Sequence, residues 1–177
     1  HWGMSGPAVL KLSAFGARIL SAKNYQYNVQ VNWLSRPTDK IVNVLQNLKK
    51  KQPKKQIFLK SPFTDIPRRL WERLVVASEI KENFKWADLS NFHIDKLANQ
   101  LTKGVYNANG KSTFKEEFVT AGGIDLKEIN FKRFESRIHE NLFFVGEILN
   151  IDAVTGGFNF QNAWTGGYIA ANAIARD

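Results

Sequence analysis

A glycine-rich, uncharged stretch near the C-terminus holds the residue types best suited to bind a ligand. From Ala153 to Ala175 the chain has no charged residue, yet it contains six Thr, Asn or Gln side chains and two Gly-Gly pairs. Glycines let a backbone approach a ligand closely, and the first free N–H groups of a helix attract an electron-rich atom. The stretch therefore predicts a ligand-binding turn and helix start, with the carboxylate of Glu147 shortly before it.

The elements around this stretch would position it at the end of a strand. The short apolar run Leu142–Val145 is typical of a buried central strand, and it is followed by Gly146-Glu147. A helix then begins near Asn159, and it contains Gly166 and Gly167, each of which costs about 1 kcal/mol relative to alanine. Close packing of this helix on a strand is the expected compensation. The polar and glycine content argues against a membrane span, and the C-terminal position argues against a signal peptide.

Composition excludes several kinds of chemistry. The 177 residues include no cysteine, so the chain has no disulfide, thiolate metal site, iron–sulfur cluster or dithiol pair. The three histidines, His1, His93 and His139, are far apart and lack metal-ligand spacing, so we expect no metal site. Redox chemistry would have to come from a bound cofactor.

The net charge of +9 is unevenly distributed. Residues 1–118 contain 20 Lys and Arg against 9 Asp and Glu, whereas residues 119–177 contain 5 against 7. The densest basic run, KKKQPKK over Lys49–Lys55, has no interleaved aromatic residues, unlike the stacking surfaces of single-strand binders. A solvated surface is the favoured interpretation, and binding of a phosphate-rich ligand or nucleic acid is the alternative.

The rest of the chain predicts an α+β arrangement. Apolar periodicity predicts a helix over Pro7–Leu20 and a cluster of three helices within residues 38–103. We expect Thr38 to cap the first of the three, Pro67 to lie in the first turn of the second, which begins at Asp65, and Ser90 to cap the third. Alternating polarity over Tyr25–Trp33 predicts a strand with one polar face. We expect that strand to pair antiparallel with residues 113–119, or with another barrel strand, and we expect a turn at Ala121–Gly123.

Three separated motifs together resemble one protein family. They are HWGMSGPAVLKLSA from His1, FVTAGGIDLKEIN from Phe118, and LFFVGEILNIDAVTGGFNFQNAWTGGYIAA from Leu142. In this order they are similar to the C-terminal part of the BaiN-like bacterial NAD(P)/FAD-dependent oxidoreductases. The resemblance covers nearly the whole chain and is weakest over residues 24–109.

The resemblance implies that this chain is part of a longer protein. The family has an N-terminal dinucleotide-binding half with a G-x-G-x-x-G fingerprint, and no such fingerprint occurs here. We therefore expect a fragment: residues 1–118 would form most of an inserted domain, with a partial β-barrel and a helical lobe over about 38–103. Residues 119–177 would be the C-terminal segment of the FAD-binding α/β domain, and the charge shift near residue 118 coincides with this boundary.

The same resemblance implies a flavin site. Glu147 would accept hydrogen bonds from the ribityl hydroxyls of FAD, and the loop and helix start at Thr155, Gly156, Gly157, Phe158 and Asn159 would meet the flavin ring. Asp152, Gly122 and Gly123 would lie close to the cofactor. The chain departs from the family at Asn150, where Asp is common, and at Ala153, where Gly is common.

We therefore expect a cytoplasmic bacterial flavoprotein that transfers hydride or electrons, with NAD(P)H as a possible donor. The isolated chain would be inactive and would not retain FAD. Its expected partners are the missing dinucleotide-binding half and an unidentified small-molecule substrate; a membrane is not expected, and nucleic acid is disfavoured. Spacing alone identifies no catalytic acid or base. The alternative function is a non-catalytic basic module that binds nucleic acid or another polyanion.

Overall fold

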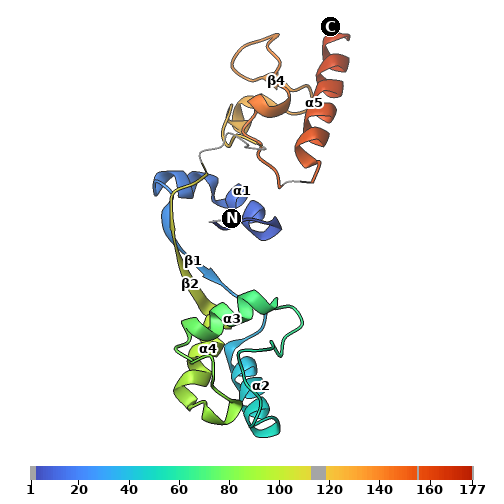
Figure 1. Ribbon diagram of the computed structural model, residues 1–177. Helices are drawn as coiled ribbons and strands as arrows, with labels where there is room; N and C mark the ends of the chain where they lie inside the picture. The colour runs from blue at the N-terminus through green and yellow to red at the C-terminus, as the bar shows by residue number, and fades with distance from the viewer. Residues whose placement is uncertain (1–2, 113–118, 155, 177) are drawn as a thin grey trace. The chain divides into compact units, whose positions relative to one another are not determined.

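The computed structural model of the chain describes residues 3–112, 119–154 and 156–176. It is a mixed α/β protein whose contacts divide it into two compact units (Figure 1). Unit 1 combines residues 1–26 and 109–177, and unit 2 is residues 27–108. The main elements are α1 (Pro7–Ala22), β1 (Gln26–Val31), α2 (Thr38–Lys51), α3 (Arg68–Ala77), α4 (Asn91–Lys103), β2 (Gly104–Asn109), β3 (Ile129–Asn130), β4 (Glu135–Ser136) and α5 (Phe158–Ile174), with short 3-10 helices η1 (Trp86–Asp88), η2 (Leu126–Glu128) and η3 (Gly146–Ile148).

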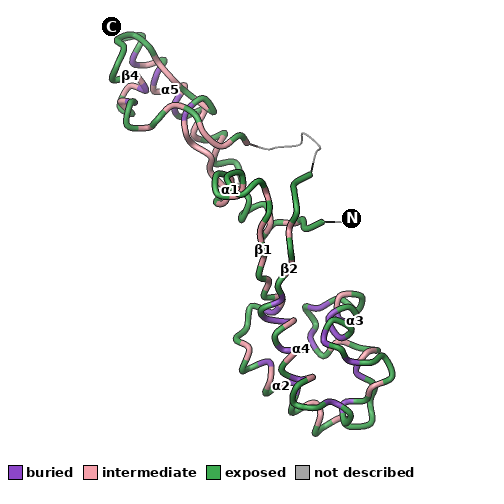
Figure 2. The backbone as a smooth tube through the Cα atoms, turned by 90° about the vertical axis from the view of Figure 1, so that its left-hand side faces the viewer, coloured by how far each residue is buried: buried purple, intermediate pink, exposed green. Residues whose placement is uncertain are grey.

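Unit 2 is built on one apolar core shared by its three helices. Ile41 and Leu45 of α2 and Leu97 of α4 are fully buried there, as is Trp71 of α3. Figure 2 shows buried residues in the helices of this unit. The indole N–H of Trp71 donates to the Ile57 carbonyl (2.8 Å), so its polar atom is satisfied within the core.

The helix boundaries agree with the sequence except at two N-termini. Ser90 caps α4 as predicted, because its hydroxyl accepts the His93 N–H (3.2 Å). We predicted that Thr38 caps α2 and that Pro67 lies inside the first turn of α3, and both predictions are wrong. Pro37 and Pro67 are the N-cap residues. The Thr38 hydroxyl is hydrogen-bonded instead to the Thr102 hydroxyl (2.9 Å).

The predicted strand over Tyr25–Trp33 is present as β1, with alternating exposed and half-buried residues. Its partner is β2, which directly follows α4 and which we did not predict. The strands are antiparallel, because the Trp33 N–H donates to Leu101 (2.9 Å) while the Gly110 N–H donates to Tyr25 (2.8 Å). Residues 113–118, the partner we proposed, lie outside the described residues. The described residues form two two-stranded sheets, so the barrel stays a prediction.

Unit 1 has a smaller core around Ile129, Phe134, Leu149 and Ala170. The predicted buried strand over Leu142–Val145 is wrong for this chain. Leu142 is 41% exposed and Val145 is 38% exposed, and the run makes one isolated bridge, between Phe143 and Glu135. No second strand among the described residues flanks this run, so its apolar side chains are left partly uncovered. The domain boundary at 118/119 stays a prediction.

The two adjacent glycines of α5 differ in their surroundings. A Cβ built on Gly166 would lie 2.7 Å from Cε1 of the buried Phe134 ring, whereas one on Gly167 would meet nothing within 4 Å. Gly166 therefore allows the close packing that we expected, although its neighbour is an aromatic ring in the turn between β3 and β4 rather than a strand. Gly167 has no such role.

Alanine substitutions at these two positions should have opposite effects on stability. Gly166→Ala must displace the Phe134 ring, which should cost about 1–3 kcal/mol. Gly167→Ala should stabilise the helix by up to about 1 kcal/mol, because alanine has the higher helix propensity. Urea unfolding of both variants measures the difference; equal stabilisation by both would contradict the packing at Gly166.

Candidate functional site

The predicted ligand-binding residues of unit 1 come from three segments. Gly122 and Gly123 precede Ile124, Glu147 lies in η3, and Gly156 and Gly157 lead into α5. The structure assigns no turn to residues 121–123, where we predicted one. Thr155, which we also predicted to bind the cofactor, lies outside the described residues. Gly123 lies against the segment after Glu147, and Gly146 lies beside Ala163 of α5.

The Gly122-Gly123 segment lies directly against the segment that follows Glu147. Ile124 N–H donates to the Ile148 carbonyl (2.9 Å), and Asn150 N–H donates to the Ile124 carbonyl (3.0 Å), which forms a parallel bridge between Ile124 and Leu149. Gly123 has φ +130°, and a Cβ at this position would lie 2.4 Å from the Ile148 carbonyl oxygen. Gly123 is therefore required by close backbone approach within the chain, independently of any ligand.

The η3 turn in turn packs on α5. Gly146 has φ +76°, and a Cβ there would lie 3.7 Å from Cβ of Ala163. Glu147 is the second residue of this turn, and it is exposed. Its carboxylate is thus held near α5 by backbone contacts while it stays open to solvent and to a ligand.

The start of α5 has an open backbone. Gly156 has φ +141°, and Gly157, the N-cap residue, has φ +90°. No side chain caps the first turn, and both glycines are exposed. A Cβ on Gly157 would meet nothing within 4 Å. An uncapped N-terminus of a 17-residue helix attracts negative charge and electron-rich atoms, in agreement with the predicted ligand class.

Asn159 closes the loop before this helix. Its Oδ1 accepts the Ala153 N–H (2.8 Å), and its Nδ2 donates to the Ala153 carbonyl (3.1 Å). The side chain is therefore used to fix residues 153–159, and any contact of Asn159 with a cofactor would come from its backbone. Asp152, immediately before the clamped residue, is half-buried, and Phe158 is 63% exposed.

Two features of this region were not predicted. Arg18 of α1 donates from Nη2 to Oδ1 of Asn150, one of the two positions at which the chain departs from the family pattern. In addition, Phe160, Trp164 and Tyr168 are 67%, 70% and 73% exposed, and the first two rings stack with centroids 6.1 Å apart. The spacing of four residues could have indicated this aromatic stripe of α5, whereas no sequence signal links Arg18 to Asn150.

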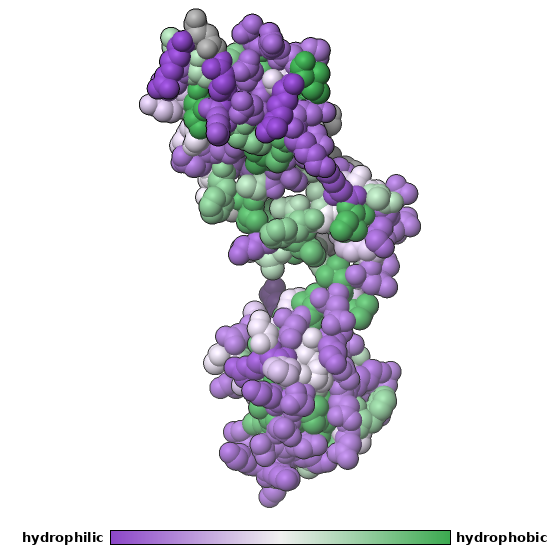
Figure 3. All heavy atoms as spheres, turned by 180° about the vertical axis from the view of Figure 1, so that it is seen from behind, coloured by the Kyte–Doolittle hydropathy of each residue, from purple (hydrophilic) through white to green (hydrophobic). Residues whose placement is uncertain are grey.

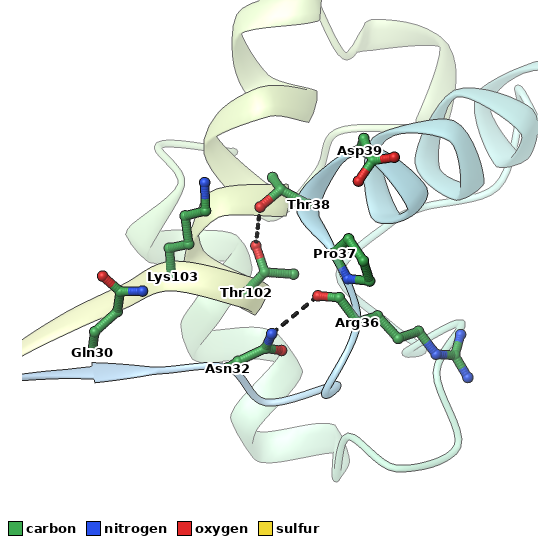
Figure 4. Close-up of a pocket in the computed structure, with 8 residues that line it drawn as sticks. All are labelled: Gln30, Asn32, Arg36, Pro37, Thr38, Asp39, Thr102 and Lys103. Carbon is green, nitrogen blue, oxygen red and sulfur yellow. Dashed lines mark hydrogen bonds between the residues drawn. The ribbon is translucent and has the colours of Figure 1, made fainter.

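Unit 2 has a polar hollow of about 570 Å³ (Figure 4). The side chains around it are largely engaged already: the Thr38 and Thr102 hydroxyls bond to each other, and Asn32 Nδ2 donates to the Arg36 carbonyl (3.0 Å). Lys103 and Asp39 also line it. We assign no role to this hollow.

Searches for metal and membrane features were negative within the part of the chain that the structure describes. No group of three or more His, Asp and Glu residues there could hold a metal ion. None of the helices described is long and apolar enough to span a bilayer.

Comparisons with known proteins identify the relationship. Residues 3–173 match the family described as HI0933-like protein Rossmann domain. Ribosomal RNA dihydrouridine synthases are similar over almost the whole chain: the protein from Haemophilus influenzae is 30% identical over 177 residues and that from Escherichia coli 28% over 179. The 3-dehydro-bile acid delta(4,6)-reductase of Clostridium scindens is 31% identical over 109 residues, which cover 62% of this chain and 27% of the relative. The chain spans 41% of the length of either synthase.

The contact at Gly123 can be tested against its neighbour Gly122, whose Cβ position is open. Both glycines have positive φ, so alanine should strain either backbone by about 1–3 kcal/mol. Gly123→Ala should in addition break the bridge and speed amide hydrogen exchange at Ile124 and Asn150. Exchange that is equally slow in both variants would contradict this assignment.

Proposed function

The chain belongs to the HI0933-like Rossmann-domain family, and we propose that it is the C-terminal part of a longer FAD-dependent oxidoreductase. The observation that carries the proposal is that the η3 turn with Glu147 lies between the Gly122-Gly123 segment and α5. Gly123 lies against the Ile148 carbonyl, and Gly146 lies beside Ala163 in the second turn of α5. In this proposal residues 1–118 belong to an inserted domain with a partial barrel and a helical lobe, and residues 119–177 complete the cofactor domain.

The residues present fit a flavin. Gly156 and Gly157 leave space for a flat ring to approach the backbone, and the uncapped N–H groups of α5 face electron-rich atoms. Glu147 would accept hydrogen bonds from ribityl hydroxyls, and Gly122 and Asp152 would border the cofactor. FAD held here would supply two-electron hydride chemistry, and the positive end of α5 would favour negative charge on the reduced ring.

The names of the relatives suggest the class of reaction. Dihydrouridine synthase and delta(4,6)-reductase both describe addition of hydrogen across a carbon–carbon double bond. We propose the same class here: a hydride goes to one carbon of an electron-poor double bond, a proton goes to the other, and NAD(P)H is oxidised. The chain's own part would be to position the flavin edge through the start of α5 and Glu147.

The remaining part of the longer protein is the proposed partner of α5. The stripe of Phe160, Trp164 and Tyr168 leaves three large rings in solvent, and covering them would be favourable at about 25 cal/mol per Å² of apolar surface. A dinucleotide-binding half that covers this stripe would also supply the pyrophosphate contacts that the chain lacks.

The other function is a non-catalytic basic module. The observation that favours a basic module is the concentration of positive charge in residues 27–108. The longer reading frame separates the two: a G-x-G-x-x-G between a strand and a helix supports the oxidoreductase, and its absence supports the module.

Flavin content tests the proposed function. The purified 177-residue chain should be colourless, because the contacts it retains would have to offset an ordering cost of about 4 kcal/mol or more. The longer protein should be yellow, and Gly157→Val in it should lower the flavin content through steric exclusion. Gly110→Val is the matched control, because Gly110 also has positive φ and open space but belongs to no predicted cofactor segment. A colourless longer protein, or equal flavin content in both variants, would overturn the assignment.

The covering of α5 makes a separate prediction. Trp164→Gln with Tyr168→Gln should change the stability of the isolated chain by no more than about 0.5 kcal/mol, because both side chains are exposed. In the longer protein the same pair should cost about 3 kcal/mol or more, if the rings are buried there. Thermal melts of both proteins measure the contrast; a neutral effect in both would rule out this interface.

A further inference from the structure

The positive charge of the chain is almost entirely carried by unit 2. Residues 27–108 contain 15 Lys and Arg against 7 Asp and Glu, a net charge of +8, whereas the remaining residues contain 10 against 9. Hydrophilic residues cover much of the unit's surface in Figure 3. The excess charge is therefore a property of the helical unit and not of the predicted cofactor region.

Backbone contacts bring the lysines of the KKKQPKK run beside a further lysine. Gln56 forms an antiparallel bridge with Lys85, and the Trp86 N–H donates to the Lys55 carbonyl (3.0 Å). The Ala87 N–H donates to the Pro53 carbonyl (3.0 Å). We call the exposed residues grouped by these contacts and by the end of α2 the lysine face: Lys50, Lys51, Lys54, Lys55 and Lys85.

Lys49 has a different part in this surface. Its ammonium donates to the Leu89 carbonyl, which ties the end of α2 to the segment before α4. The side chain of Lys49 is half-buried. We therefore assign it a role in positioning the neighbouring lysines and leave it out of the lysine face.

Among the described residues, no acidic side chain forms an ion pair with a lysine of the lysine face. No carboxylate there lies within ion-pairing distance of its five ammonium groups, whereas Arg68 pairs with Glu72 (2.7 Å) and Lys96 with Glu79 (2.7 Å). The hydrogen bond and charge of Lys96 hold the pKa of Glu79 below its usual range. The nearby Asp88 carboxylate accepts the Lys85 backbone N–H (2.8 Å), so it serves as a local cap.

A hollow of about 590 Å³ adjoins this face. Lys49, Lys50 and Pro53 line one side, and Asn91 and Gln46 add amide groups. Ammonium and amide donors around an open hollow suit phosphate and sugar oxygens. The KKKQPKK run has no aromatic residue on which a base could stack, so contacts there would be with the backbone of a nucleic acid and not with its bases.

We propose that the lysine face docks the phosphate backbone of an RNA substrate. The inference rests on the proposed function for the reductase activity. The choice of RNA rests on the relatives that align over almost the whole chain, which are named ribosomal RNA dihydrouridine synthases. It departs from the expectation drawn from the sequence, which favoured a merely solvated run. Contacts to the backbone give affinity and orientation, and the base to be reduced is selected elsewhere.

The test is binding of a fluorescently labelled RNA hairpin by the 177-residue chain, measured by anisotropy without cofactor. The variant Lys50→Gln/Lys51→Gln/Lys54→Gln/Lys55→Gln is compared with Lys11→Gln/Lys23→Gln/Lys127→Gln/Lys132→Gln, which removes the same charge from exposed sites in unit 1. The first should weaken binding about tenfold or more and reduce the slope of log K against log salt by about 3, and the second should have less than about a twofold effect. Matching unfolding midpoints establish that both variants fold.

Three results would overturn the proposal: no RNA binding by the parent chain, equal losses in the two variants, or tighter binding to anionic vesicles or polyglutamate than to RNA at the same salt. The outcome is separable from that of the flavin experiment. If only the first variant loses RNA binding and the longer protein is colourless, the RNA-binding role of the lysine face is supported and the oxidoreductase proposal is rejected. If the longer protein is yellow and the chain does not bind RNA, the oxidoreductase proposal is supported and the RNA-binding role is rejected.

Discussion

Two backbone hydrogen bonds of Ile124 hold the candidate site together. They join the residue after the Gly122-Gly123 segment to Ile148 and Asn150, and so connect segments that are far apart in the sequence. The approach is close enough that residue 123 has no room for a side chain. Since η3 also packs on α5 through Gly146 and Ala163, these contacts connect the Gly122-Gly123 segment, the Glu147 turn and the body of α5.

The two units gain their stability in different ways. Among the described residues, sixteen buried apolar side chains form the core of unit 2, whereas four form that of unit 1. Burial of apolar surface is the main favourable term in folding, so the helical unit has the larger share of it. Unit 1, with the stripe of α5 and most of α1 in solvent, is the part most dependent on further contacts. The candidate cofactor region thus lies in the unit with the smaller apolar core.

The sequence was informative where one local rule determines the structure. The helical periodicity of residues 38–103 and the Ser90 cap need only neighbouring residues, and both are present. The strand β2 was missed because it follows α4 without a turn signal and contains polar residues at Asn107 and Asn109. Asn159 was predicted as part of the ligand-binding helix start, and the pairing of its amide with Ala153, six residues earlier, was not foreseen. Such pairings depend on the three-dimensional path of the chain, which no spacing rule contains.

The chain passes into unit 2 from β1 and leaves it through β2, two strands that are hydrogen-bonded neighbours. The bond from Trp33 to Leu101 (2.9 Å) lies just beyond β1 and just before β2, so the two ends of the helical segment are side by side. Segments with adjacent ends are the ones that domain insertion tolerates, because their replacement leaves the flanking backbone unchanged. The segment between β1 and β2, which carries most of the positive charge, could therefore be replaced by one of another size without a change in the pairing of the two strands. In the proposed oxidoreductase, such an exchange would alter the charged surface of unit 2 without changing the candidate cofactor residues of unit 1.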